Sequence, residues 1–313
     1  MVFHLRHAEM MDRRLKRLSI EKRHLDFWHR RGRGSYHLEN VELTRRVLAM
    51  GLRLVRLVNR GKRNVLDLRL RNVDFSFPNL PGAFDGFTIL HLSDLHLDCL
   101  AGLSERLAEV ISHVFVDLCV LTGDYRFEVE GTAETSNLEL AKALPCVRSR
   151  LGMVGILGNH DFLEAAFGLE QMGVRMLINS SFEVRQGAES LWLVGLDDPH
   201  YYGCDDLPAA LKAVPPDAFK ILLVHSPEML REASQAGFDL YLCGHTHAGQ
   251  ICLPWLGPII RNAACSRRFV RGKWTYEGVQ GYTSAGIGAS LLPVRFQCPP
   301  EVTVIRLKKQ ESK

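Results

Sequence analysis

Short apolar runs, each followed by glycine or polar residues, recur along the chain from residue 87 onward. Runs of this length without polar alternation are typical of strands buried in a sheet. We predict such strands at residues 87–92, 117–121, 153–157, 191–196, 219–224, 239–243, 280–284 and 302–307, with short ones near 176–178 and 182–184. Helices are predicted between them at residues 104–114, 137–144 and 162–172, and after Pro227. This alternation indicates an α/β fold whose sheets are covered by helices on their outer faces.

The chain before residue 74 has a different pattern. Residues 1–38 are rich in Arg, Lys and His, and we expect partial order there at best. From Asn40 to about Gly61 the apolar positions share one helical face and the arginines lie largely opposite, which predicts an amphipathic helix. Residues 72–85 contain Pro78 and Pro81 and predict a linker or an edge strand. We therefore divide the chain into a basic N-terminal extension, residues 1–73, and a main domain, residues 74–313.

The overall charge of +4 hides an asymmetry between these two parts. Residues 1–73 hold 19 Lys and Arg against 7 Asp and Glu, a balance of +12, whereas the remainder holds 20 against 28, a balance of −8. The extension therefore predicts a surface for an acidic partner. Its amphipathic helix suits the interface of an anionic membrane, and packing on the main domain is the alternative. Nucleic acid is disfavoured as a partner because few aromatic residues stand here for base stacking.

The remaining composition bounds the class of protein. With 313 residues and 46% hydrophobic residues, the chain is able to bury a sizeable core. Its eight cysteines form no Cys-x-x-Cys pair, which predicts free thiols in a reducing compartment. The charged N-terminus lacks the apolar run of a secretory signal, and no segment reaches the roughly 18 to 20 apolar residues of a membrane-spanning helix. We expect a cytoplasmic protein.

Residue types that bind metals follow five of the predicted strands. They are, in chain order, Asp94, His96, Asp124, Asn159, His160, His225, His245 and His247. In pairs separated by one residue, such as His245 and His247, both side chains leave the same side of the strand exit. The carboxyl ends of strands are also where α/β folds bind ligands. A further strand end, at residues 197–200, predicts a turn, and the alternative is a segment that lines the cleft of the site.

The chemistry of these side chains indicates a metal centre. Oxygen and imidazole donors without thiolates favour Mn²⁺, Fe or Zn²⁺ in a catalytic site. The candidates are too many for a single tetrahedral ion, so two divalent ions fit better. A carboxylate such as Asp124 is suited to bridge two ions about 3.5 to 4 Å apart, as in two-metal hydrolytic sites.

Five motifs carry these residues: Asp94-Leu95-His96, Gly123-Asp124, Gly158-Asn159-His160-Asp161, His225 and Gly244-His245-Thr246-His247. Together they resemble the motifs of the calcineurin-like metallophosphoesterases. The resemblance implies a four-layer αββα sandwich, two mixed sheets flanked by helices, with a dinuclear centre at the strand ends. It places Asp94, His96 and His247 on one metal, Asn159, His225 and His245 on the other, and Asp124 between them. It further implies that His160 protonates the leaving oxygen or steadies the phosphate, with Asp161 as its orienting partner.

A narrower resemblance covers residues 244–300, including Leu253-Pro254, Gly257-Pro258 and Arg295-Phe296-Gln297-Cys298. These residues are similar to those of a bacterial branch of the YkuE and YaeI type. One departure from the wider family follows Asp124. Many relatives have an acidic or amide residue soon after this aspartate, whereas this chain continues with Tyr125-Arg126-Phe127-Glu128. Arg126 is therefore a candidate phosphate contact.

The resemblance implies a hydrolase. We expect two divalent ions, Mn²⁺ first with Fe or Zn²⁺ as alternatives, and hydrolysis of a phosphodiester or pyrophosphate bond through attack by a metal-bound hydroxide. The branch suggests a membrane-associated substrate such as UDP-2,3-diacylglucosamine and a peripheral location on the inner membrane. Soluble nucleotide or phosphoprotein substrates are the alternatives within enzymes. A non-catalytic scaffold is the alternative from another class, and it is disfavoured because the whole ligand set is present.

Overall fold

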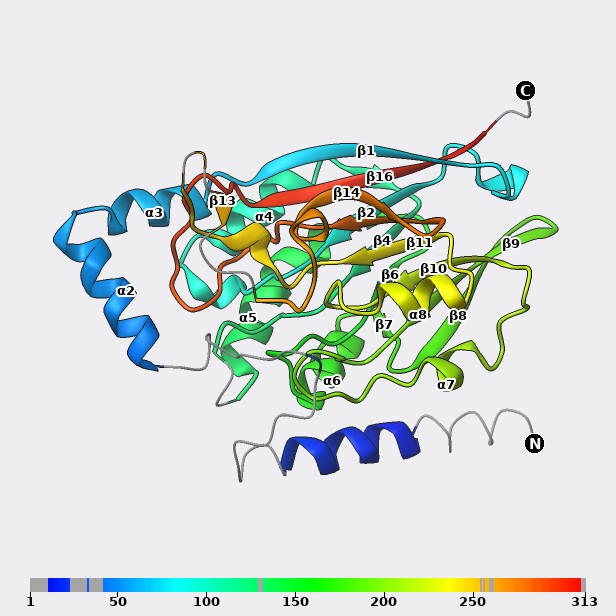
Figure 1. The fold of residues 1–313 in the computed structure, drawn as a ribbon, viewed down its shortest axis with the longest axis horizontal. Coiled ribbons are helices and arrows are strands. Elements are labelled where there is room, and N and C mark those ends of the chain that lie inside the picture. Colours follow the sequence, from blue (N-terminus) through cyan, green and yellow to red (C-terminus); the bar gives the residue numbers. More distant parts are fainter. Residues whose placement is uncertain are drawn as a thin grey trace.

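Two six-stranded mixed sheets form the body of the protein (Figure 1). The computed structural model describes residues 11–22, 33, 42–128, 132–253, 255, 257–258 and 262–310. Of the predicted N-terminal extension, residues 1–10, 23–32 and 34–41 therefore lie outside the described part of the chain. All eight of the longer predicted strands are present, within a few residues of the expected bounds.

The first sheet has the strand order β1-β16-β2-β4-β6-β7. Its strands are β1 (Arg69–Phe77), β2 (Thr88–Leu92), β4 (Leu118–Leu121), β6 (Met153–Gly155), β7 (Val174–Met176) and β16 (Glu301–Lys309). Only the pairing of β16 with β2 is antiparallel. Figure 1 shows β1 and β16 side by side along one margin of the molecule, so that β1 is an edge strand.

The second sheet has the order β14-β15-β11-β10-β9-β8. Its strands are β8 (Ser180–Gln186), β9 (Glu189–Gly195), β10 (Phe219–Leu223), β11 (Leu240–Cys243), β14 (Gly272–Tyr276) and β15 (Val279–Thr283). The hairpins β8–β9 and β14–β15 are antiparallel, and the four inner strands run parallel. Two small pairs accompany the sheets: β3 (Phe115–Val116) with β5 (Arg148–Ser149), and β12 (Cys252–Leu253) with β13 (Gly257–Pro258).

Helices cover the outer faces of both sheets. They are α4 (Leu103–Ile111), α5 (Glu134–Ala143), α6 (Leu163–Gln171), α7 (Leu207–Leu211) and α8 (Leu230–Gln235). Short 3-10 turns lie at Gly82–Phe84, Leu97–Cys99, Leu144–Cys146, His247–Gly249 and Arg267–Phe269. The first three helices pack on the first sheet, and α7 and α8 pack on the second.

A continuous apolar core separates the two sheets. Ile89 and Leu118 of the first sheet pack there with Ile221 and Leu240 of the second, and all four are fully buried. Burial of each such side chain contributes about 1.5 to 3 kcal/mol. Because helices lie outside each sheet, the molecule has the four layers expected of an αββα sandwich.

The segment before β1 adds detail to the prediction and corrects it once. Residues 11–22 form a helix whose Arg17 is buried, while the rest of residues 1–38 apart from Arg33 lies outside the described residues, so the expectation of partial order stays a prediction. The single helix predicted from Asn40 to Gly61 is two helices, α2 (Glu42–Leu54) and α3 (Val58–Val65). Arg56 lies between them with a φ of 55°, a left-handed conformation that an α-helix does not accommodate. Among the described residues, no helix is both long and apolar enough to cross a lipid bilayer.

Candidate metal centre

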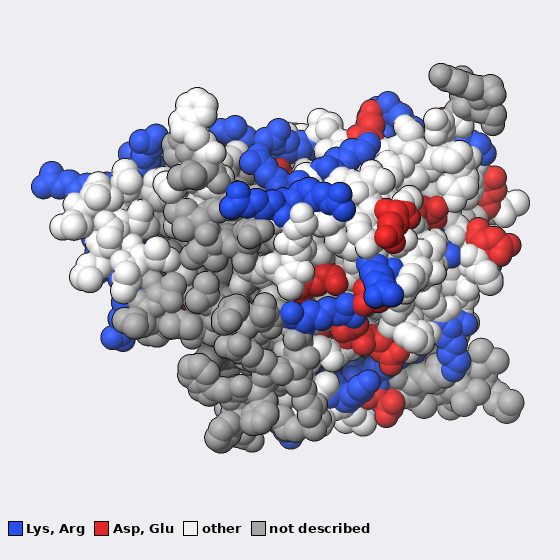
Figure 2. Space-filling view, in the orientation of Figure 1, with Lys and Arg blue, Asp and Glu red and all other residues white. Residues whose placement is uncertain are grey.

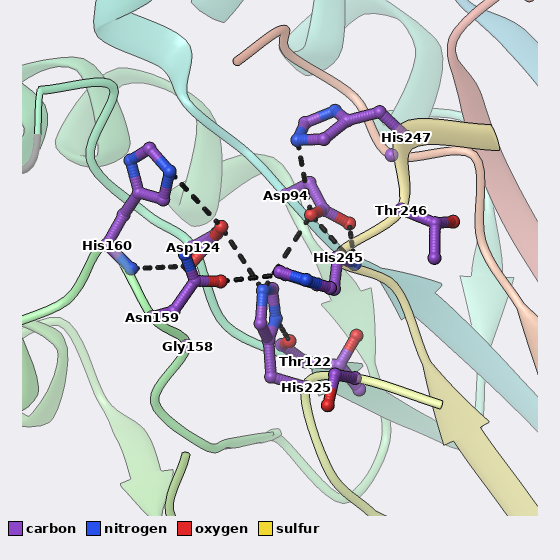
Figure 3. Close-up of polar contacts among 12 residues, drawn as sticks. Asp94, Thr122, Asp124, Gly158, Asn159, His160, His225, His245, Thr246 and His247 are labelled. Carbon is purple, nitrogen blue, oxygen red and sulfur yellow. Dashed lines mark hydrogen bonds and ion pairs between the residues drawn. The ribbon is translucent and has the colours of Figure 1, made fainter. Parts of the chain in front are cut away.

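The candidate ligands converge at one edge of the two sheets, where parallel strands end together (Figure 3). The loop after β2 carries Asp94 and His96, the loop after β4 carries Asp124, and the loop after β6 carries Asn159 and His160. The second sheet supplies the rest: His225 follows β10, and His245 and His247 follow β11. All eight side chains are buried. The structure thus brings together every metal ligand expected from the sequence.

Two groups of ligand atoms share one carboxylate. Asp94, His96, Asp124 and His247 form one group, and Asp124, His225 and His245 form the other. Within each group the ligand atoms lie within 4.8 Å of one another. Oδ2 of Asp124 is 3.2 Å from Nε2 of His225 and 3.6 Å from Nε2 of His96. This arrangement is that of a dinuclear site.

Asn159 faces the second group. Its Oδ1 lies 2.8 Å from Nδ1 of His245, so both atoms point to the same side of Asp124. On the side of the first group, Nε2 of His247 is 3.5 Å from Oδ1 of Asp94. The amide oxygen of Asn159 therefore adds a neutral donor to the second group, which has one carboxylate where the first group has two.

The ligands are held by an unusual backbone. Asp94, His96, Asp124, His245 and His247 have φ values of 48°, 36°, 58°, 69° and 48°, in the left-handed region. This conformation costs about 1 to 3 kcal/mol for a residue other than glycine and is concentrated at functional sites. Gly158 allows the close approach of two loops, because a Cβ atom there would overlap the carboxylate of Asp124. The surrounding fold thus stabilises a ligand geometry that isolated loops would not adopt.

Hydrogen bonds to backbone carbonyls orient two of the histidines. Nδ1 of His96 is 2.5 Å from the carbonyl oxygen of Arg126, and Nδ1 of His225 is 2.7 Å from that of Thr122. A carbonyl only accepts, so Nδ1 of each ring carries a proton and Nε2 faces the carboxylates. Within the described part of the chain, the buried Nε2 of His96 has no hydrogen-bond partner. An unsatisfied imidazole nitrogen beside carboxylates fits a divalent cation, and so does a donor set without thiolates.

The pKa values of the site reflect burial and crowding. Burial raises the pKa of Asp94 to about 6, and the negative charge of Asp124 adds to this effect. Burial lowers the pKa values of His96 and His245 to about 3. Burial also acts to lower the pKa of His225, but the charges of Asp124 and Asp94 outweigh it and raise this pKa to about 10. The carboxylate pair therefore needs a compensating positive charge, which a divalent cation would supply.

His160 lies at the edge of the paired groups, with its ring 4.0 Å from the carboxylate of Asp124. Its Nδ1 is 3.0 Å from the carbonyl oxygen of Phe127, so this carbonyl orients the ring. The sequence predicted that the Asp161 carboxylate orients the His160 ring, but the structure gives this carboxylate other partners. The carboxylate of Asp161 instead accepts the backbone N–H groups of Asp124, Tyr125 and Gly158, each at 2.8 Å. Asp161 thus ties the loop after β4 to the loop after β6.

Several buried side chains beside the ligands were not predicted as part of the site. The ring of His200 lies 4.0 Å from that of His245, and its Nδ1 is 3.0 Å from the carboxylate of Glu228. Nη2 of Arg295 is 3.2 Å from Nδ1 of His247. For residues 197–200 the sequence favoured a turn over a segment that lines the cleft, although a histidine after a strand end is the same signal that identified His225.

Comparison with known proteins agrees with this geometry. The family described as calcineurin-like phosphoesterase matches residues 87–249, which include all of the candidate ligands. The chain belongs to this family. It is a metal-dependent phosphoesterase, and its buried Asp and His side chains form the dinuclear-type site of a hydrolase.

Two curated proteins and one solved structure illustrate what this chain is similar to. The metallophosphoesterase YkuE of Bacillus subtilis is 31% identical over 242 residues, covering 73% of this chain and 82% of its own. Phosphodiesterase YaeI of Escherichia coli is 30% identical over 231 residues, covering 71% of this chain and 82% of its own. Among solved structures, Phosphopantetheinyl Hydrolase (PptH) from Mycobacterium tuberculosis has a TM-score of 0.41 at 10% identity, covering 65% of this chain and 91% of its own.

Proposed function

We propose that this phosphoesterase hydrolyses a phosphodiester or pyrophosphate bond at the paired Asp and His groups. The observation that carries the proposal is the position of Asp124, whose carboxylate belongs to both groups. The relative YaeI is named a phosphodiesterase, which supports a diester over a monoester.

In the proposed site, Asp94, His96 and His247 would hold one divalent ion and Asn159, His225 and His245 the other, with Asp124 available to both. The proposed metal is Mn²⁺, because imidazole, amide and carboxylate donors without thiolates suit it. Bound divalent ions supply Lewis acidity toward a phosphoryl oxygen and lower the pKa of water.

The remaining roles fall to the chain's own side chains. We assign His160 the role of general acid. The Phe127 carbonyl accepts the Nδ1 proton and leaves Nε2 beside Asp124, so the doubly protonated ring would give its Nε2 proton to a leaving oxygen and become neutral. Asp161 acts by holding the loops of His160 and Asp124 together. Arg126, whose guanidinium stacks 4.6 Å from the ring centre of Phe162, is the proposed phosphate contact.

We propose a substrate at a membrane surface, of which UDP-2,3-diacylglucosamine is the candidate. The support is the outer face of α2, where Val47, Met50 and Leu54 have 55%, 67% and 85% of their surface exposed. Arginines such as Arg45 and Arg53 flank these apolar side chains. An exposed apolar stripe with flanking basic residues is typical of a helix that lies in an anionic membrane interface.

The same end of the molecule carries a second exposed apolar group. Trp255, in the turn between β12 and β13, is fully exposed, and Leu253 is 45% exposed. In Figure 1, β13 and α3 lie at the same end of the molecule as α2, and Figure 2 shows this end as largely uncharged with basic side chains at its margin. Exposed tryptophan side chains are enriched at membrane interfaces.

This apolar end is linked to the metal centre through one short segment. The backbone N–H of Arg295 donates to the carbonyl of Gly61 on α3, and the N–H of Cys252 on β12 donates to the carbonyl of Phe296. The guanidinium of Arg295 contacts the ligand His247. A membrane-bound α2 would therefore hold the metal centre near the lipid surface, and the proposed location is peripheral.

Turnover of UDP-2,3-diacylglucosamine by Mn²⁺-loaded protein, followed as UMP release, tests the function. The control substrate is bis(p-nitrophenyl) phosphate. Faster release of UMP than of nitrophenol supports the lipid-linked substrate. Cleavage of the nitrophenyl ester alone would keep the diesterase and point to a soluble nucleotide or phosphoprotein, and cleavage of neither by metal-loaded protein would favour a non-catalytic scaffold.

A further inference from the structure

The helix over residues 11–22 packs against α6, below which it is drawn dark blue in Figure 1. Charged side chains make most of this contact. Arg14 pairs with Glu170 on α6, and Arg13 donates to the carbonyl of Asn179 at 2.6 Å. The apolar side chains of Met11 and Leu15 face outward instead, with exposed fractions of 52% and 57%. The docked face of the helix therefore combines buried charged side chains with Ile20, which packs on Tyr202 and Cys204, and the charged contacts indicate specific partners on the body.

Arg17 is the centre of this contact, and its side chain is completely buried. Its Nε donates to Glu21 at 2.7 Å, and its Nη1 donates to Asp197 at 2.6 Å. Its Nη2 donates to the backbone carbonyl of Asp161 at 2.6 Å. The plane of the guanidinium lies 3.7 Å from the ring centre of Tyr202. Each nitrogen of the fork thus has an acceptor, a geometry that a lysine is unable to reproduce.

The contact with Asp161 connects this helix to the metal centre. Asp161 follows His160, and its carboxylate holds the backbone of Asp124, Tyr125 and Gly158. Glu21 binds the end of the turn that begins at His160, because its carboxylate accepts the N–H of Leu163 at 2.8 Å. Arg17 and Glu21 together therefore hold the turn over residues 160–163 by hydrogen bonds to its backbone.

We propose that Arg17 is a positioning residue for His160. Its hydrogen bond to the Asp161 carbonyl, with the Glu21 bond to Leu163, fixes the turn that aims the His160 ring at Asp124. This inference rests on the proposed function, since it assigns His160 a part in proton transfer. The positive charge of Arg17 is neutralised by Glu21 and Asp197 within the molecule, so this arginine serves the site and is not offered to an acidic partner.

Leaving-group dependence tests the role in catalysis. We would compare the p-nitrophenyl and phenyl esters of thymidine 5′-monophosphate, because the poorer phenol leaving group depends more on a general acid. For Arg17→Gln we expect kcat on the phenyl ester to fall about tenfold or more, with a smaller fall on the nitrophenyl ester and little change in KM or metal content. Arg17→Lys should recover part of the loss. Arg14→Gln, the matched control on the same helix, should leave both esters within about twofold of the wild type.

Hydrogen exchange supplies a readout that does not depend on activity. The amides of residues 158–163 should exchange faster in Arg17→Gln than in the wild type, and at the wild-type rate in Arg14→Gln. If Arg17→Gln fails to fold, Glu21→Gln serves instead. It keeps an oxygen that accepts the Leu163 N–H but removes the ion pair with Arg17. We expect faster exchange of the same amides in this variant. Wild-type protein that cleaves neither these esters nor UDP-2,3-diacylglucosamine would refute the proposed function, while the exchange data would still decide whether Arg17 holds the turn. Unchanged exchange at residues 158–163, or equal losses on both esters in Arg17→Gln and Arg14→Gln, would overturn the inference.

Discussion

The carboxylate of Asp161 accepts the backbone N–H of Asp124, with 2.8 Å between that nitrogen and Oδ2. The same oxygen accepts the N–H of Gly158, so one carboxylate ties together the two loops that carry Asp124 and His160. In Asp161→Asn one oxygen becomes an NH₂ group that faces N–H donors. We expect a loss of about 1 to 3 kcal/mol in the free energy of unfolding, with lower metal content and turnover. Urea denaturation and metal analysis measure these effects. Asp217→Asn, at an exposed aspartate, is the control. Wild-type stability in Asp161→Asn would contradict a stabilising role for these hydrogen bonds.

Removal of the His160 ring should separate proton transfer from metal binding. In His160→Ala the metal ligands keep their places, because the His160 ring is not a member of either ligand group. We therefore expect near-normal metal content and a turnover about 10² to 10⁴ times lower, the usual range for loss of a general acid. Steady-state kinetics with parallel metal analysis measures both. Turnover equal to the wild type would remove His160 from the proposed mechanism.

Asp124→Asn should have the opposite effect on the metal. This carboxylate is shared by both ligand groups, and a neutral amide does not supply the charge that two divalent ions require. Metal content and turnover should fall together. Inductively coupled plasma mass spectrometry of the purified variant measures the metal, and full activity in this variant would refute the assignment of Asp124 as the bridge.

His91 on β2 makes the stability of the protein depend on pH. Burial lowers the pKa of this imidazole to about 3, and its Nε2 contacts the hydroxyl of Thr122 at 2.8 Å. Because the folded pKa lies below the unfolded value of 6.5, the unfolded chain takes up a proton first as the pH falls. The contribution is fully present above pH 6.5 and is lost between pH 6.5 and 3, with a slope of up to about 1.4 kcal/mol per pH unit.

His91→Gln keeps a polar group beside Thr122 and cannot titrate in this range. We expect the free energy of unfolding, measured in urea at several pH values on metal-free protein, to fall less steeply below pH 6.5 in this variant. The other buried histidines contribute equally to both proteins, so the difference reports on His91. Parallel curves for variant and wild type would contradict the prediction.

The exposed face of α2 should bind anionic vesicles. Met50 and Leu54 are 67% and 85% exposed, so glutamate at both positions should leave the fold intact while opposing insertion and anion attraction. We expect flotation with vesicles rich in phosphatidylglycerol for the wild type and a loss of flotation for the double variant. Leu138→Glu, at a 61% exposed leucine on α5, is the matched control and should float normally. Equal flotation of all three proteins would exclude α2 as the membrane contact.

Much of the metal centre was predictable because its signals are local in the sequence. Apolar runs such as 219–224 and 239–243 end at His225 and at the pair His245 and His247. The extended alternation expected for that pair was wrong, because both residues have left-handed backbone and belong to different ligand groups. Parallel strands then bring their carboxyl ends to one edge. The break between α2 and α3 was missed because a left-handed residue such as Arg56 leaves no trace in helical periodicity.

The sequence by itself therefore determined the α/β class, the four layers implied by its motifs and the set of candidate metal ligands. Only the tertiary structure decided what orients them. Arg17 meets Asp161 and Asp197 across 144 and 180 positions of the chain, and neither pairing follows from a local pattern. A run of basic residues looks the same in sequence whether its charges face solvent or a buried carboxylate, because the partner is chosen by packing and desolvation in three dimensions. For the same reason, the turn of Asp161 toward backbone N–H groups, and away from the His160 ring, became visible only once the loops after β4 and β6 were seen together.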